Sequence, residues 1–346
     1  PELSKISTNA SNSDSFVLKI NTNGTTIWAK NFGGTSASST GSCITADLKS
    51  NIYLGGYFES GDLSVPSLSK ISNNKNRDSF VIKISRDGEI FWAKKFGGTL
   101  ATTKGMCIGV DMSSNIYFSG QYNLGKLTTP ALKRLNYDIM GNDVFVMKLN
   151  NSGDILWAKN FGGKKANSFS YAMTVDKLGY VYIGGAFMNS NMANPKLKHI
   201  GIGHGHKDAY VLKLDSLGAI IWAHNYGGIN AQAAFYCISV DSASNVYLGG
   251  IFKFTNLTTP KLSKLGNQDM FALKLDSTGA LSWAKNFGGT GTDALGNAIA
   301  SDVLGNVYLG GVFRSGNINA PVLNRVGVAD GILLKAQIAD TVTASN

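Results

Sequence analysis

The chain has 346 residues, 43% of them apolar, and a formal net charge of +10. This apolar fraction suffices for a continuous hydrophobic core. No stretch approaches the ~20 consecutive apolar residues that a membrane helix requires, so we expect no membrane-spanning helix.

From the N-terminus, the strand-like stretch DSFVLKI at 14–20 is followed by a glycine turn and by TIWAKNFGG at 26–34. A small-residue strand, NIYLGGYF at 51–58 and a long loop complete a unit that then recurs to the end of the chain. All five tryptophans occupy one place in this unit, at spacings of 64, 65, 65 and 61 residues: Trp28, Trp92, Trp157, Trp222 and Trp283. A fixed period predicts a repeat architecture, because each unit buries its apolar face only against its neighbours.

The first complete set of strands is predicted at 42–47, 51–58, 78–84 and 90–96, which are rich in β-branched and aromatic residues. An Asp-x-x-x-Asn turn such as Asp47 to Asn51 joins the first pair of strands. A glycine turn joins the second pair, where positive φ carries no steric penalty for glycine. We expect no helix.

Units of four antiparallel strands, repeated about five times, predict an all-β fold of the β-propeller type, whose radial closure leaves only short strand edges. A β-solenoid is the alternative, but its coils usually have shorter periods and lack such hairpin turns. In a propeller, the glycine pairs such as Gly55-Gly56 lie where strands crowd together. The tryptophans then fill the space between neighbouring blades.

One stretch of the chain carries a family resemblance. GMCIGVDMSSNIYFSG at 105–120, LTTPAL at 127–132, DVFVMKLNNSG at 143–153 and ILWAKNFGG at 155–163 resemble, in order and spacing, the bacterial β-propeller repeat known as the SBBP repeat. The resemblance extends over nearly the whole chain. It implies a secreted or surface-exposed bacterial protein, and it brings no catalytic motif with it.

The repeats define one propeller domain, 1–338, and a tail, 339–346. We place the units at about 14–77, 78–142, 143–207, 208–268 and 269–329, with a partial unit at 330–338. The chain then has six strands of the type that contains Phe16, and five of each other type.

We expect a five-bladed ring that closes when the N-terminal strands pair with the last blade. Residue 1 falls in the middle of a repeat and is not Met, so we expect further residues upstream, and with more repeats there six or seven blades. The surplus strand is also a template for pairing with another molecule.

Cysteines and histidines offer little chemistry. Cys43, Cys107 and Cys237 each lie four residues before a strand-ending Asp, where two other units have Ala, which indicates small buried positions. Equivalent positions in different blades are too far apart for disulfides, and a shared metal at the axis is the alternative. His199, His204 and His206 form a second candidate metal site in one loop. Without a carboxylate or Cys at suitable spacing, a glycine-rich loop is the preferred interpretation, and we expect neither metal nor cofactor.

The carboxylates do not predict an enzyme. Glycoside hydrolysis needs two carboxyl groups that face one bond. Most acids recur at turns and strand ends in every unit, and the non-repeating ones, Asp62, Asp138 and Asp293, lie in loops without a sequence partner. We therefore name no catalytic residue.

The positive charge is concentrated in the long loops that contain proline. A pattern Pro-x-Leu-x-basic-aliphatic recurs there, and its basic members are Lys5, Lys70, Arg134, His199, Lys264 and Arg325. These loops should emerge on the face opposite the tight turns. If the Leu and the aliphatic residue hold the loop down, the basic side chain is free, and the face carries a ring of charge that attracts anionic partners. The alternative is that these residues only maintain solubility.

A second set of lysines recurs in the strands, one per strand of the Phe16 type: Lys19, Lys83, Lys148, Lys213, Lys274 and Lys335. Because polar residues alternate with apolar ones in half-buried strands, we expect these lysines to face solvent.

Two functions remain. The first is a structural protein of a bacterial surface that assembles with other surface or outer-membrane proteins or with itself. The second is a lectin-like module that binds an anionic polysaccharide through Lys70, Arg134, His199, Lys264 and Arg325. A lectin should repeat exposed aromatic residues beside the basic ones, and only the basic position repeats, which favours the structural role. Nucleic acid is not expected for the same reason.

Overall fold

The structure is a computed structural model that describes residues 2–73, 75–202, 205–302, 305–319 and 321–336. Pro1, His204, the end of the expected last strand at 337–338 and the tail 339–346 lie outside the described residues. The described residues form strands and turns without any helix, and so none that is long and apolar enough to cross a bilayer.

Four types of long strand alternate along the chain, and we name them inner, second, third and outer. The inner strands are β3 (Ser38–Ala46), β7 (Thr102–Val110), β13 (Asn167–Val175), β17 (Gln232–Val240) and β23 (Asp293–Ser301). The second strands are β4 (Ile52–Glu59), β8 (Ile116–Asn123), β14 (Val181–Met188), β18 (Val246–Lys253) and β24 (Val307–Arg314).

The third strands are β1 (Ser15–Ile20), β5 (Asp78–Ile84), β11 (Asp143–Leu149), β15 (Lys207–Leu214), β21 (Gln268–Leu275) and β27 (Ala329–Ala336). The outer strands are β2 (Thr26–Phe32), β6 (Ile90–Phe96), β12 (Ile155–Phe161), β16 (Ile220–Tyr226) and β22 (Leu281–Phe287). The excess of one third strand confirms the count expected from the sequence.

Short two-residue strands, which the sequence did not predict, pair within three of the proline-containing loops. They are β9 (Leu127–Thr128), β10 (Ala131–Leu132), β19 (Leu257–Thr258), β20 (Lys261–Leu262), β25 (Ile318–Asn319) and β26 (Val322–Leu323). Each of these pairs closes the loop on itself across its proline.

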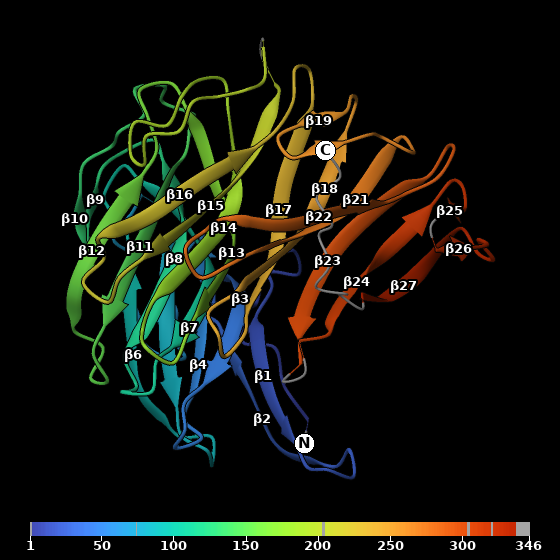
Figure 1. Cartoon of the computed structure of the whole chain (residues 1–346). Coiled ribbons are helices and arrows are strands. Elements are labelled where there is room, and N and C mark those ends of the chain that lie inside the picture. Colours follow the sequence, from blue (N-terminus) through green and yellow to red (C-terminus); the bar gives the residue numbers. More distant parts are fainter. Residues whose placement is uncertain (1, 74, 203–204, 303–304, 320, 337–346) are drawn as a thin grey trace.

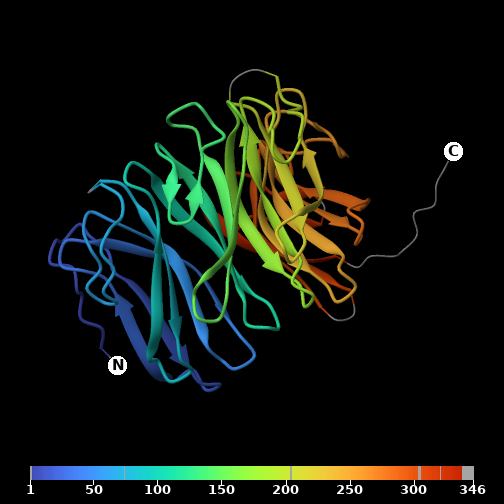
Figure 2. The same ribbon diagram turned by 90° about the vertical axis from the view of Figure 1, so that its left-hand side faces the viewer.

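The long strands pair antiparallel in the order inner, second, third, outer. Single parallel bridges, Lys207 with Gln232 and Gln268 with Asp293, join the last three sets into one 11-stranded sheet. The sets follow one another in chain order around a centre, from blue through green and yellow to red (Figure 1). The view from the side shows the same succession (Figure 2). Each complete sheet takes two strands from one sequence unit and two from the next.

The inner strands surround the centre of the molecule. Successive inner strands contact one another, and all five contribute side chains to a central cavity of about 290 Å³. Its lining includes Cys43, Cys107, Tyr171, Tyr236 and Ile299. An all-β arrangement of antiparallel sheets around an inner cavity is a propeller-like fold.

A β-bulge in each inner strand explains the glycine pairs. In β3 the register with β4 shifts between Gly41 and Cys43, and the carbonyl oxygen of Thr40 points to Gly56, where a Cβ would overlap it. The same carbonyl contact recurs at the second glycine of every pair: Gly120, Gly185, Gly250 and Gly311. The expectation that these glycines lie where strands crowd together is confirmed.

The described strands do not close the ring as expected. β1 and β2 form a sheet of their own, and among the described residues no ladder joins either of them to β24 or β27. The physical reason is competition for one edge, because β27 pairs with β24 along the whole length from Val307 to Arg314. The number of blades therefore stays a prediction.

Candidate functional site

The repeated Lys, Tyr and Trp side chains hold neighbouring sheets together. Lys148 lies opposite Tyr117 in β8, with its Nζ 5.0 Å from the ring centroid and 3.7 Å from the Asp111 carboxylate. The Lys148 ammonium and the Trp157 indole N–H both donate to the carbonyl oxygen of Ser216 in the next sheet, at 3.3 and 3.0 Å. The side chain of Trp157 is half-buried against an apolar cluster shared by the two sheets.

This arrangement overturns the expectation of solvent-facing side chains for three of the six strand lysines, while Lys19 and Lys274 are half-buried. Lys83, Lys148 and Lys213 are only 6%, 9% and 6% exposed, while Lys335, after which no sheet follows among the described residues, is exposed. The reason is that the third strands are covered on both faces by neighbouring sheets. Each buried ammonium is compensated by a ring and by carbonyl oxygens.

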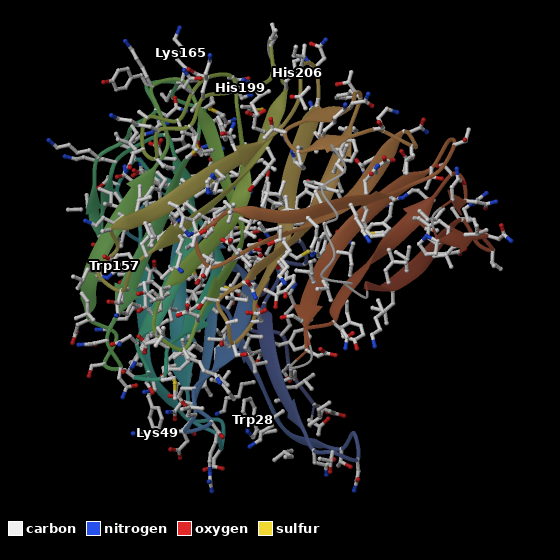
Figure 3. All side chains as sticks on the ribbon, viewed as in Figure 1. Trp28, Lys49, Trp157, Lys165, His199 and His206 are labelled. Carbon is white, nitrogen blue, oxygen red and sulfur yellow. The ribbon has the colours of Figure 1, made fainter. Side chains whose placement is uncertain are left out.

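The long loops and the tight turns emerge at opposite ends of the molecule, as the sequence predicted. Lys165, His199 and His206 lie at one end, and Lys49 of a tight turn lies at the other (Figure 3).

The basic loop residues are not free, so that expectation is wrong. Arg134 donates to the Asp138 carbonyl at 2.8 Å and to the Gly141 carbonyl, and its side chain is only 13% exposed. The other basic members likewise reach carbonyl oxygens of their own loops: Lys5 to Asn9, Lys70 to Asn76, His199 to His206, Lys264 to Gly266 and Arg325 to Gly327. Their shared role is to close the loop ahead of the next third strand.

An aspartate at the start of the next third strand anchors each of these loops, and it is fully buried in the four internal ones: Asp78, Asp143, Asp208 and Asp269. Asp143 opens β11 and accepts the backbone N–H groups of Leu135 and Asn136 at 2.8 and 3.1 Å. Its carboxylate lies against Gly162, where a Cβ would overlap it. Burial acts to raise the pKa of Asp143 above its usual value.

The histidine loop holds no metal site among the described residues. The ring Nε2 of His199 lies 3.1 Å from the His206 carbonyl oxygen and 3.9 Å from the Asp208 carboxylate, a partner that the sequence analysis did not anticipate. In the described part of the chain no three His, Cys, Asp or Glu side chains gather into a group that could hold a metal ion.

The cysteines are buried thiols. Burial raises the pKa of both Cys107 and Cys237 to about 12, and it also raises that of Cys43. All three are free, as expected from the spacing of the inner strands. A thiol with so high a pKa is a poor nucleophile and a poor metal ligand at neutral pH.

The three non-repeating aspartates lie apart in separate contacts. Asp62 accepts the Lys70 backbone N–H, Asp138 that of Met140, and Asp293 the Ser315 hydroxyl. The sequence analysis expected Asp293 in a loop, and this is wrong, because Asp293 is the first residue of β23.

Two apolar faces are exposed at the ends of the succession of sheets. On β1, the N-terminal end face consists of Phe16, Leu18 and Ile20, which are 59%, 46% and 55% exposed. Their equivalents are fully buried in the following third strand: Phe80, Ile82 and Ile84. These equivalents pack against Val17 and Phe32 of the preceding sheet.

The C-terminal end face is formed by β27. Leu333 is 75% exposed there, whereas its equivalents Val81, Val146 and Val211 are completely buried against the following sheet. The two end faces are thus the two halves of the interface that every internal pair of sheets forms.

A small pocket lies at the loop end of the inner strands. Lys207 begins β15, Gln232 begins β17 and Lys253 ends β18, and Gln232 is the backbone partner of both lysines. With Tyr236 and Ile251 these residues line a pocket of about 70 Å³. Tyr236 also lines the central cavity.

Sequence reasoning missed this pocket, because its two lysines and Gln232 do not repeat at the equivalent positions of other units. The available signal was the departure from the repeat. The position of Lys207 is Arg77, Asn142 and Gln268 in other sheets, and the bulge position of Tyr236 is Ser42 and Met106 elsewhere.

No family model matches the chain. A search of curated proteins gives an uncharacterized WD repeat-containing protein of Acanthamoeba polyphaga mimivirus, 24% identical over 80% of this chain. The chain spans 24% of that relative's length. The repeat-protein nature of the chain agrees with this similarity, whereas the resemblance to SBBP repeats stays a prediction.

The chain is only distantly similar to solved structures. One is a protein of unknown function from Bacteroides caccae, with 12% identity, a TM-score of 0.37, and coverage of 71% of this chain and 68% of that chain. Another is a gluconolactonase from Xanthomonas campestris, with 12% identity, a TM-score of 0.36, and coverage of 84% and 74%.

Proposed function

We infer that this chain is a non-catalytic scaffold that assembles head to tail, the C-terminal end face of one copy against the N-terminal end face of the next. The observation that carries this proposal is the exposure of Phe16, Leu18 and Ile20, whose equivalents are buried in every internal interface. Burying a Phe, Leu or Ile side chain contributes about 1.5–3 kcal/mol each. Contiguous exposed apolar side chains of this kind mark protein interaction surfaces.

The contact would be heterologous, because it joins two different faces of the same chain. Such contacts produce rings or open filaments. The resemblance to SBBP repeats supports placing this assembly outside a bacterial cell or on its surface, where other surface or outer-membrane proteins that offer a similar sheet are further partners.

Sedimentation velocity tests the proposal. The wild-type chain should associate as its concentration rises, and the double variant Phe16→Ser with Leu18→Ser should stay monomeric. The matched control is Ile139→Ser with Met140→Ser, which removes two side chains of similar exposure, 63% and 66%, from a loop. Association that survives the β1 variant, or is lost in the control alone, would refute the role of the end face.

The second function expected from the sequence, an anionic polysaccharide bound by the five basic loop positions, stays a prediction. No contact favours it, because these side chains already donate to their own loops. We infer no enzymatic activity, since the cysteines have raised pKa values and the non-repeating aspartates lie in separate contacts.

A further inference from the structure

The pocket between β15, β17 and β18 holds two cations without an acid. Lys207 and Lys253 flank Gln232 in a continuous row of backbone partners. The lining residues are Lys207, Gln232, Ala233, Ala234, Tyr236, Ile251 and Lys253, and none of them is acidic. Among the described residues, neither lysine forms an ion pair. The Nζ of Lys207 lies 5.6 Å from the ring centroid of Phe169, and that of Lys253 lies 5.0 Å from the ring centroid of Phe254.

Where the equivalent position in another sheet carries a positive charge, that residue has an acidic neighbour. Arg77 occupies the place of Lys207 two sheets earlier in the succession, and it forms an ion pair at 3.0 Å with Glu59. Arg314, equivalent to Lys253, is the cross-strand partner of Asp293. The pocket therefore departs from the repeat by two positive charges with no negative one.

In the unbound protein, the proximity of the two positively charged lysines is electrostatically unfavourable. Burial, and secondly the charge of Lys253, lower the pKa of Lys207. Two like charges that share a half-buried site are mutually destabilising unless an opposite charge joins them. An anion in the pocket would supply that charge and would accept hydrogen bonds from both ammonium groups.

Aromatic rings extend from the pocket toward the axis. The ring centroids of Tyr236 and Tyr171 are 5.1 Å apart, and Phe169 stacks on Tyr171 at 5.7 Å with an interplanar angle of 11°. All three rings are partly exposed. Tyr236 borders the pocket on one side and the central cavity of about 290 Å³ on the other. A ligand ring can therefore lie against Tyr236 while its charged group enters the pocket.

We propose that Lys207, Lys253 and Tyr236 form a binding site for an acidic saccharide, whose carboxylate or sulfate lies between the two lysines and whose pyranose ring packs on Tyr236. The pocket volume of about 70 Å³ fits a single anionic group and is too small for the sugar ring. The lining holds no Arg, whose planar fork binds phosphate bidentately, so the proposal commits to an acidic saccharide and makes a nucleotide an outcome of the test. This site is separate from the end faces and from the basic loop positions.

Isothermal titration calorimetry on the whole chain tests the proposal. The probes are galacturonate, a sulfated galactose, neutral galactose, inorganic sulfate and AMP. Galacturonate or the sulfated galactose should bind, more weakly at high salt. Galactose and sulfate should bind at least about tenfold more weakly than the acidic sugar, since each offers only half of the contacts. Which acidic sugar binds more tightly distinguishes a carboxylate from a sulfate ester.

Variants locate the site. Lys207→Gln with Lys253→Gln should weaken binding by about tenfold or more. Tyr236→Ala should weaken the binding of the acidic sugar but not the binding of inorganic sulfate. The control, Lys165→Gln with Lys196→Gln, removes the same charge from exposed loop positions and should leave binding unchanged. Thermal unfolding of each variant verifies that it folds.

Three results would overturn the proposal. The first is that no saccharide probe binds the wild-type chain. The second is that AMP or sulfate binds as tightly as the acidic sugars, because the site would then recognise phosphate or any anion. The third is that the control pair weakens binding as much as the Lys207 and Lys253 pair, since the effect would then be one of net charge.

Discussion

Trp157 donates its indole N–H to the carbonyl oxygen of Ser216, 3.0 Å away and 59 residues further along the chain, in the turn between the third and outer strands of the next sheet. Trp28 and Trp92 make the same contact with Arg86 and Asn151. This repeated bond fixes the distance between successive sheets at their outer edge, while the apolar clusters fill the space further in.

The indole hydrogen bond predicts that substitution of two equivalent tryptophans, Trp157 and Trp222, will lower the free energy of unfolding by different amounts. Trp157→Phe should lower the free energy of unfolding by about 1 kcal/mol for the lost hydrogen bond, in addition to the loss of contact area. Trp222 is the matched control, because within the described residues its indole N–H has no hydrogen-bond partner. Trp222→Phe should therefore cost less in urea unfolding. Equal costs for the two would mean that the bond to Ser216 contributes nothing.

The buried lysines are predicted to stabilise the fold. Lys148→Met removes the donor to Ser216 and leaves the Asp111 carboxylate without its cation, so unfolding should become easier by about 2–3 kcal/mol. Lys335→Met removes the exposed equivalent in β27 and should change stability by less than about 0.5 kcal/mol. Chemical denaturation of both variants measures the difference, and a similar cost for both would refute the bridging role of Lys148.

The basic loop residues are predicted to act on stability rather than on ligands. Arg134→Met should lower the free energy of unfolding by about 1–2 kcal/mol, because three backbone carbonyl oxygens lose their donor. Binding of polygalacturonate, measured by calorimetry, should not change. A loss of polysaccharide binding without a loss of stability would restore the basic loop face as a binding surface.

Lowering the pH should remove the contribution of the tight-turn aspartates to the free energy of unfolding. Burial acts to raise the pKa of Asp241, but hydrogen bonds from Asn245 and from the Tyr247 hydroxyl outweigh it, so its pKa is lowered. A carboxyl group whose pKa is lowered in the folded state stabilises the fold above its unfolded pKa of about 3.9, and this contribution disappears as pH falls through the lower folded value.

Asp241→Asn is therefore expected to be less stable than the wild type at neutral pH, with a difference that shrinks below about pH 4. Thermal unfolding between neutral and acidic pH measures it. A difference that stays constant down to acid pH would show that the charge of Asp241 has no part in stability.

The sequence predicts the strands well where a residue's neighbours belong to the same repeat. The expected bounds of β5 and β6 match the structure, from Asp78 to Ile84 and from Ile90 to Phe96. The strand expected from residue 42 begins earlier, at Ser38, and residue 42 is the unpaired residue of its β-bulge. Alternation of polar and apolar residues cannot reveal such a bulge.

Sequence patterns fail where two sheets meet. Lys83 alternates with apolar residues as a solvent-facing side chain would, yet it is buried, because its partner is a carbonyl oxygen 68 residues away in the next sheet. The same limit applies to Lys207 and Lys253. They are 46 positions apart, and only the parallel bridge to Gln232 brings them into one pocket.

Mixing two variants, each with one end face altered, tests the proposed assembly most directly. Phe16→Ser with Leu18→Ser keeps the C-terminal end face, and Leu333→Asp keeps the N-terminal one. Each variant alone should sediment as a monomer, while an equimolar mixture should form a dimer and no larger species. A mixture that stays monomeric, or a wild-type chain that never associates, would contradict head-to-tail assembly and favour a ring closed within one chain.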